Sequence, residues 1–369
     1  HEFATYRAHS LPPCHRRLPM ILRDLITCLS RVTTSGPLDQ NIDVLTASSR
    51  EVVPGGLFAA IRGTAVDGHR FIGGALSNGA AAILAETAPP AELSADITWL
   101  HVPDSREALS AMASAMENHP WKEMAVAGVT GTNGKTTTTY LIHHVMKTAW
   151  HRSGLLGTIL VDDGEAVSPT RHTTPGAVEL SALLGRMRDH GCRGVALEVS
   201  SHALGRGHYR DITFDVAVFT GAGQGADSEP LFLHGHPRFA VVNHDDAAGK
   251  ALSRQINNGT QVLTFGTNGS TELRGSILGM DSAGMTLSIA SPWGGGELQT
   301  GLMGRSNLSG LLAAAGTLAL MGMPWNQVMH QLEIMRPLPG RMHCLGGEPG
   351  QPVIVMDDAD TPEMLGQAL

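Results

Sequence analysis

Short apolar runs alternate with longer segments of helical periodicity through the middle of the chain. The runs typical of buried strands are residues 124–129, 195–199, 216–219 and 239–242. Apolar positions recur at helical spacing in residues 136–149, 175–190 and 311–321. Because crossover helices bury parallel strands on both faces, this alternation predicts an α/β fold built on a parallel sheet.

A smaller α/β pattern precedes the parallel sheet, in residues 42–117. Its clearest helix is predicted for residues 105–117. Asp104 or Ser105 can cap this helix, because short polar side chains accept hydrogen bonds from its first free N–H groups. The helix-breaking run 118–121 then predicts a domain boundary.

The last third of the chain is less regular. A polar region with strand-like pieces, residues 261–302, leads to a helix predicted at 327–335. One strand at 353–356 and the start of one helix at 362–369 follow. A lone strand and helix cannot bury their apolar faces, so we expect residues 336–369 to be an incomplete domain.

Composition narrows the class of protein. The 369 residues suit two or three domains, and the net charge of −8 argues against a nucleic-acid-binding protein, whose surface carries a basic patch. Four scattered cysteines suggest neither a zinc site nor a disulfide framework. No apolar run reaches the roughly 18 residues that span a membrane. We therefore expect a cytoplasmic protein, with residues 1–19 a tag or upstream segment before Met20.

The strongest chemical signal is the run 128–137, Gly-Val-Thr-Gly-Thr-Asn-Gly-Lys-Thr-Thr. A strand enters a glycine-rich turn and a helix begins at Lys135 or Thr136. Backbone N–H groups and the helix N-terminus can bind phosphate oxygens, Lys135 adds a positive charge, and Thr136 has the hydroxyl position that binds Mg²⁺. The general consensus would place glycine at Val129, and the alternative is a glycine-rich helix entry with a chance lysine. The order of elements favours a nucleoside triphosphate site.

This run resembles the ATP loop of the Mur ligases, which build the stem peptide of peptidoglycan. Further segments, in the family's order, narrow the resemblance to the MurE branch, the UDP-N-acetylmuramoyl-tripeptide synthetases: residues 48–50, 54–58, 67–69, 173–175, 198–204, 304–307 and 339–342. The resemblance covers residues 21–369. It implies a UDP-sugar-binding α/β domain at 20–119, a P-loop-type parallel-sheet ATPase domain at 120–335, and a stub of a Rossmann-like third domain at 336–369.

The resemblance also implies a reaction. ATP activates the carboxylate of UDP-MurNAc-L-Ala-D-Glu as an acyl phosphate, and the amine of meso-diaminopimelate, or of lysine, attacks it. Lys135 would hold the phosphates, and Thr136 and Glu198 would bind Mg²⁺. The implied ATP-binding residues are Gly131, Thr132, Asn133, Gly134, Lys135, Thr136, Thr137, Asn307 and Arg341.

The implied substrate residues lie in several segments. Ser49 matches a family position that contacts the uracil moiety, and Thr64 lies in the loop that does likewise. Thr173, Thr174 and Ser200 match positions that bind the muramoyl-dipeptide. Arg206 and His208 stand where the family has Gln and Arg. Each hydroxyl residue taken alone favours a turn or cap role, and His202 alone could equally be a core histidine.

Three segments depart from the family's pattern. After Thr220 the family has a histidine and a carbamylated lysine that serve a second Mg²⁺, whereas this chain has no lysine between Lys147 and Lys250. We therefore expect one metal site to be weak or absent. Gly310 replaces an asparagine on the adenine side. Residues 357–362 are Asp-Asp-Ala-Asp-Thr-Pro where the family has Asp-Tyr-Ala-His-Thr-Pro, and these acids should repel phosphates.

Two functions of different classes follow. The first is an ATP-dependent amide ligase of peptidoglycan precursor synthesis. The second is a protein that keeps the fold and binds ATP or the UDP-sugar without ligation. A folylpolyglutamate synthase would share the loop, but Ser49 and the segment 67–69 argue against it. The sequence indicates no protein partner.

Overall fold

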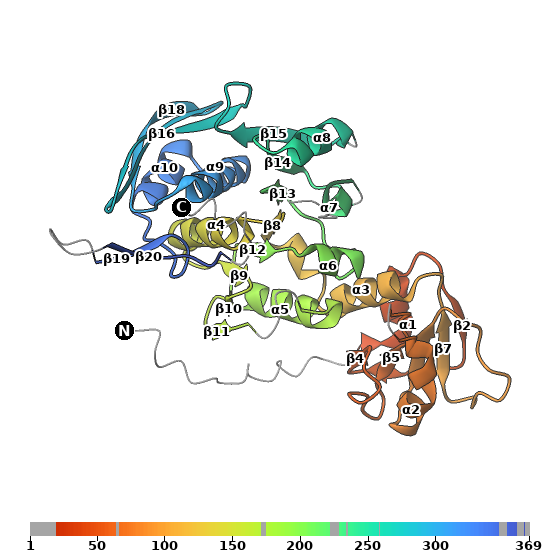
Figure 1. Cartoon of the computed structure of the whole chain (residues 1–369). Helices are drawn as coiled ribbons and strands as arrows, with labels where there is room; N and C mark the ends of the chain where they lie inside the picture. The colour runs from red at the N-terminus through yellow and green to blue at the C-terminus, as the bar shows by residue number, and fades with distance from the viewer. Residues whose placement is uncertain are drawn as a thin grey trace. The chain divides into compact units, whose positions relative to one another are not determined.

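The computed structural model describes residues 20–63, 66–170, 175–221, 229–233, 235–257, 259–346, 353–359 and 365 (Figure 1). The chain packs as two compact units. Unit 1 comprises His1–Pro120, Pro175–Arg186 and Arg206–Ile212, and unit 2 comprises Trp121–Thr174, Met187–Gly205 and Thr213–Leu369. Within the described residues, no helix is both long and apolar enough to cross a membrane.

Unit 1 contains a five-stranded sheet in the order β2-β7-β6-β5-β4, parallel except for β2. Its strands are β2 (Thr33–Ser35), β4 (Leu45–Thr46), β5 (Leu57–Ala59), β6 (Ala82–Ala85) and β7 (Thr98–His101), and β1 (Met20–Ile21) pairs separately with β3 (Asn41–Ile42). Its shorter helical elements are α1 (Leu22–Leu25), η2 (Ile26–Cys28), η3 (Gly68–Phe71) and α2 (Ile72–Ser77). Alternate residues of β6 enter two apolar clusters, one on each face of the sheet. Strand β6 is therefore apolar throughout.

Helix α3 (Ser105–Met116) confirms the predicted cap. The Asp104 carboxylate accepts hydrogen bonds from the N–H groups of Arg106, at 2.9 Å, and Glu107, at 3.0 Å. Two donors that the helix itself cannot satisfy are thereby bonded. Local side-chain chemistry thus determines where this helix starts.

Unit 2 contains an eleven-stranded sheet in the order β11-β10-β9-β12-β8-β13-β14-β15-β16-β17-β18. The strands from β9 to β16 in this order pair in parallel, and both edges are antiparallel. The parallel part confirms the predicted fold class. The bounds are β8 (Ala125–Thr130), β9 (Gly154–Leu156), β10 (Leu160–Asp162), β11 (Val167–Pro169), β12 (Gly194–Glu198), β13 (Val216–Phe219), β14 (Phe239–Asn243), β15 (Gln261–Gly266), β16 (Leu273–Asp281), β17 (Gly284–Ser291) and β18 (Gly294–Thr300).

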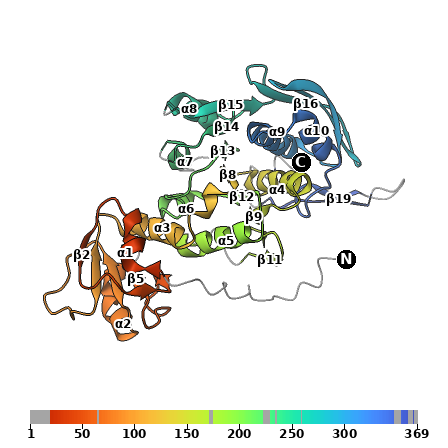
Figure 2. The same ribbon diagram turned by 180° about the vertical axis from the view of Figure 1, so that it is seen from behind.

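Helices α4 (Lys135–Trp150) and α9 (Arg305–Leu320) lie side by side in unit 2 (Figures 1 and 2). Both contribute to one large apolar cluster with the central strands, which α10 (Trp325–Glu333) extends. The predicted helix 311–321 is therefore too short, because its polar first turn shows no apolar periodicity. The remaining helices are η4 (Pro120–Lys122), α5 (Ala177–Asp189), which crosses the unit boundary, α6 (Ser201–Gly205), α7 (Glu229–Leu233) and α8 (Ala247–Gln255).

The strand predicted at 353–356 forms as β20 (Val353–Met356), but the expectation that it stands alone is wrong. It pairs antiparallel with β19 (His343–Gly346), a strand that we did not predict. Strand β19 is too short to show the alternation of apolar and polar residues that predicts a strand. Pairing with β20 is what makes this segment a strand. The helix predicted for 362–369 lies outside the described residues, apart from Leu365.

Candidate functional site

The predicted phosphate loop connects β8 to α4. Gly131 and Gly134 both have positive φ, at 135° and 82°, and Gly134 is the N-cap of α4. A Cβ atom on Gly131 would lie 2.6 Å from the carbonyl oxygen of Gly221. Glycine is therefore required at 131 both for its backbone conformation and for space.

Thr220 and Gly221, just after β13, brace this loop. The Thr220 hydroxyl donates to the carbonyl oxygens of Thr130, at 3.1 Å, or Asn133, at 2.5 Å. The Thr132 N–H donates to the Gly221 carbonyl oxygen at 2.7 Å. The sequence marks Thr220 only as the residue after which the chain departs from the family's pattern. It does not predict the contact with the phosphate loop, because residues 128–137 do not indicate which distant segment packs against them.

Lys135 is the first residue of α4, a 16-residue helix. Its ammonium nitrogen lies 2.8 Å from the Gly131 carbonyl oxygen and 2.9 Å from that of Thr132. The lysine charge and the N-terminus of α4 thus lie at the same loop. This geometry favours anion binding, since both the helix N-terminus and the ammonium are positive.

Glu198 ends β12, the strand beside β8, and is only 3% exposed. Both carboxylate oxygens lie 3.2 Å from the Thr136 hydroxyl, and one accepts the Thr158 N–H at 3.0 Å. A carboxylate and a hydroxyl beside a phosphate loop are oxygen ligands of the kind that Mg²⁺ prefers, with phosphate and water completing its shell. The structure therefore brings together the two predicted metal ligands, and they fit one divalent cation.

Asn307 lies in the first turn of α9, where its side-chain amide donates to the Met303 carbonyl oxygen at 2.7 Å. One turn later, a Cβ atom on Gly310 would be 3.4 Å from the Thr137 methyl group. This is an ordinary van der Waals distance, and it shows that α9 packs against the first turn of α4 at this position. The sequence does not predict this contact, because it joins two segments that are far apart in sequence.

Arg341 has a different environment from the other predicted ATP residues. Within the described residues its guanidinium contacts Asp358, with an ion pair at 2.8 Å. The neighbouring Asp357 carboxylate accepts the Met342 N–H at 3.0 Å. Asp358, which stands where the family has tyrosine, and Asp357, which the family shares, thus hold the segment that carries Arg341.

The predicted substrate residues are divided between the units. Ser49, Arg206 and His208 belong to unit 1, and Ser200 belongs to unit 2. The Ser200 hydroxyl accepts the Ala203 N–H at 3.2 Å, so it has the cap role that we considered as an alternative. Thr64, Thr173 and Thr174 lie outside the described residues.

His202 is exposed, so the alternative of a core histidine is wrong. Of the region where the family places its second metal, residues 222–228 lie outside the described part of the chain. Among the described residues, no three His, Cys, Asp or Glu side chains gather in a group that could hold a metal.

Two family models match the chain. The Mur ligase middle domain matches residues 129–225 and 228–318, and the Mur ligase family catalytic domain matches residues 41–117. A Xylella fastidiosa UDP-N-acetylmuramoyl-L-alanyl-D-glutamate–2,6-diaminopimelate ligase is 37% identical over 349 residues, which are 90% of this chain and 70% of that protein. Its Bacillus velezensis counterpart is 33% identical over 350 residues, with the same coverage.

Solved structures agree on the fold. A UDP-N-acetylmuramoyl-L-alanyl-D-glutamate–2,6-diaminopimelate ligase has a TM-score of 0.78 at 23% identity, over 94% of this chain and 73% of that one. A Lactobacillus casei folylpolyglutamate synthetase scores 0.53 at 17% identity, over 71% of this chain and 73% of that one. The chain therefore belongs to the Mur ligase family, in the branch of the UDP-N-acetylmuramoyl-tripeptide synthetases.

Proposed function

We propose that this protein is an ATP-dependent amide ligase that adds meso-diaminopimelate to UDP-MurNAc-L-Ala-D-Glu. The single observation that carries the proposal is the contact between Thr136 and Glu198 beside the phosphate loop. The names of the most similar relatives supply the substrates. We place the reaction in the bacterial cytoplasm, where ATP is available.

In this proposal the loop holds the triphosphate. N–H groups of residues 131–137 bind its oxygens, and Lys135 moves from the Gly131 and Thr132 carbonyl oxygens to the β- and γ-phosphates. The substrate carboxylate attacks the γ-phosphorus, which gives an acyl phosphate and ADP. The amine of the incoming amino acid then attacks the acyl carbon, and inorganic phosphate leaves.

Glu198 and Thr136 would hold Mg²⁺. When bound, Mg²⁺ would neutralise negative charge on the phosphate groups. Glu198 is well placed because its backbone is fixed in the sheet and the Thr158 N–H orients its carboxylate. Asn307 and Arg341 complete the proposed nucleotide site. Arg341 must exchange Asp358 for the nucleotide, so we expect its contribution to be small.

The residues that we propose for precursor binding are Ser49, Thr64, Thr173, Thr174, Ser200, Arg206 and His208. The first two would contact the uridine and the others the muramoyl-dipeptide. Their hydroxyl and cationic groups suit an anionic, hydroxyl-rich ligand.

The test is phosphate release by the purified chain with ATP, Mg²⁺, UDP-MurNAc-L-Ala-D-Glu and meso-diaminopimelate, with the amide product measured by mass spectrometry. We expect release that requires all three substrates and falls at least 100-fold in Lys135→Ala. Lys122→Ala, which removes a lysine outside the loop, is the matched control. If ATP and the precursor bind but phosphate release stays at background, the protein binds without ligation and the proposal fails. If an amide product forms with lysine and not with meso-diaminopimelate, lysine is the amino acid that the enzyme adds.

A further inference from the structure

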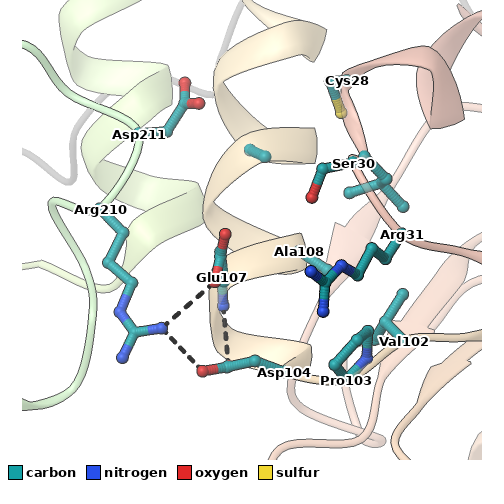
Figure 3. A pocket seen from close by; sticks show the side chains of 12 residues that line it. Cys28, Ser30, Arg31, Val102, Pro103, Asp104, Glu107, Ala108, Arg210 and Asp211 are labelled. Carbon is teal, nitrogen blue, oxygen red and sulfur yellow. Dashed lines mark hydrogen bonds and ion pairs between the residues drawn. The ribbon is translucent and has the colours of Figure 1, made fainter.

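The segment Arg206–Ile212 is part of unit 1, although it follows β12 of unit 2 in the chain. Tyr209 and Ile212 are buried, at 6% and 4% exposure, whereas Arg210 and Asp211 extend along α3. Figure 3 shows Arg210 directed toward the start of α3 and Asp211 toward its other end. The two ends of one helix thus contact two consecutive residues of the segment.

Polar contacts make this attachment. The Arg210 guanidinium lies 2.7 Å from the Asp104 carboxylate and 3.6 Å from that of Glu107 (Figure 3). The Asp211 carboxylate lies 3.3 Å from Nδ1 of His119, just beyond the end of α3. These contacts restrict both translation and rotation of the segment relative to α3.

Arg210 and the first turns of α3 line a cavity. This cavity, of about 440 Å³, lies over this face of the helix, which presents the small side chains of Ala108 and Ala111. Arg31 also lines the cavity, and its guanidinium makes no ion pair with the described residues. The segment is therefore held by the buried side chains of Tyr209 and Ile212 together with the polar contacts of Arg210 and Asp211.

Asp104 has two roles in this arrangement. One carboxylate oxygen caps α3, and the other accepts from Arg210. Burial opposes ionisation, but the Glu107 N–H and the Arg210 guanidinium outweigh it and lower the pKa of Asp104. The carboxylate is therefore ionised at neutral pH, and its position is fixed by the helix that it caps.

We propose that Arg210 and Asp211 are positioning residues for the muramoyl-dipeptide. They act through Arg206 and His208, two to five residues earlier in the same segment, and hold these side chains in place from α3. This inference rests on the proposed function, in which Arg206 and His208 contact the dipeptide. Partly exposed ion pairs contribute little to folding, so the effect should appear in ligand affinity more than in stability.

The experiment is calorimetric titration of the whole chain with UDP-MurNAc-L-Ala-D-Glu, with UDP and with ATP. We expect Arg210→Ala to raise the Kd of the UDP-MurNAc-dipeptide about 3- to 10-fold and to leave the Kd values of UDP and ATP unchanged. Asp104→Asn keeps an oxygen to cap α3 but loses the charge, so it should have the same effect. The double variant should be no worse than either single one, and Arg210→Lys should recover part of the affinity.

Arg31→Ala is the matched control, since Arg31 lines the same cavity without an ion pair to the described residues. It should change none of the three affinities. If the wild-type chain binds no UDP-MurNAc-dipeptide, the proposed function fails and the inference fails with it. If the wild-type chain binds but Arg210→Ala and Asp104→Asn bind equally well, the inference alone is wrong. An equal loss of UDP and precursor affinity would also overturn it, because a general defect of unit 1 would weaken both.

Discussion

Gly131 shows how one residue can be set by two constraints at once. Its φ of 135° disfavours any side chain, and the carbonyl oxygen of Gly221 occupies the space where a Cβ would stand. Glu198 is the second such residue, buried at the end of β12 yet bonded to Thr136 and Thr158. Gly131 has a backbone conformation that only glycine adopts readily, and Glu198 is a polar side chain in a buried position. Both lie where phosphate and metal are proposed to bind.

Gly131→Ala should lower the free energy of unfolding by about 1–3 kcal/mol and abolish ATP binding, because the new methyl group displaces the loop. Chemical denaturation and ATP titration measure the two effects. Gly322→Ala is the control for backbone strain, since Gly322 has a φ of 87° but open space around its Cβ position. It should be destabilised while still binding ATP. Normal ATP affinity in Gly131→Ala would contradict the role of this loop.

Glu198→Gln should keep the packing at the end of β12 and remove the charge. We expect the affinity for ATP in the presence of Mg²⁺ to fall at least 10-fold, with little change in affinity without the metal, because an amide is a poorer ligand for a hard cation. Titrations with and without Mg²⁺ make the comparison. Glu297→Gln, at an exposed position of β18, should bind as the wild type does. If Mg²⁺ changes the ATP affinity of Glu198→Gln and Glu297→Gln equally, Glu198 is not a metal ligand.

At the scale of elements, helix α4 is anchored at both ends by different chemistry. Its N-terminus forms the phosphate loop, and its second half is tied to β10 through Asp162, which is 2% exposed. Asp162 accepts from Lys147 at 2.5 Å and lies 3.3 Å from Nε2 of His143. Burial raises the pKa of Asp162, but the hydrogen bonds of His143, Lys147 and the Gly164 N–H outweigh it and lower the pKa to about 2.

Asp162→Asn should lower the free energy of unfolding by about 3 kcal/mol at pH 7, because it leaves Lys147 without its buried partner. A carboxyl whose folded pKa is depressed stabilises the fold above its unfolded pKa, near 3.8, and this contribution is lost as the pH falls through about 2. The difference between variant and wild type should therefore shrink between pH 4 and pH 2, as measured by denaturant unfolding. Asp43→Asn, at an exposed position, should show no such pH dependence. A difference that stays constant with pH would refute the ionic role.

At the scale of the molecule, the residues proposed to bind ATP and those proposed to bind the uridine belong to different units. The phosphate loop lies wholly in unit 2, whereas Ser49 lies in unit 1. Unit 1 is assembled from three separate stretches of chain, so two segments that follow the phosphate loop in sequence return to the unit that precedes it. The two units should therefore respond separately to their own ligands.

Calorimetric unfolding should show this separation. ATP at 100 times its Kd should stabilise unit 2 by about 2.7 kcal/mol, and UDP should stabilise unit 1 in the same way. Ser49→Ala should remove only the effect of UDP, and Lys135→Ala only that of ATP. A single transition that both ligands shift equally in both variants would be incompatible with separate sites.

The sequence by itself determined the features that depend on neighbouring residues. The Asp104 cap, the strand–loop–helix order around Lys135 and the run of parallel strands follow from hydrogen bonding and periodicity within short stretches. The family was also identified from the sequence, because its motifs are short and keep their order. These features need no knowledge of distant contacts.

Only the tertiary structure decided the contacts between distant segments. It placed Thr220 under the phosphate loop, paired β20 with β19, joined Arg341 to Asp358 and attached the segment 206–212 to α3. Each of these depends on which strand or helix becomes a neighbour, and burial across the whole core selects those neighbours. Local pattern therefore predicted the chemistry of the candidate site, while long-range packing decided which residues support it.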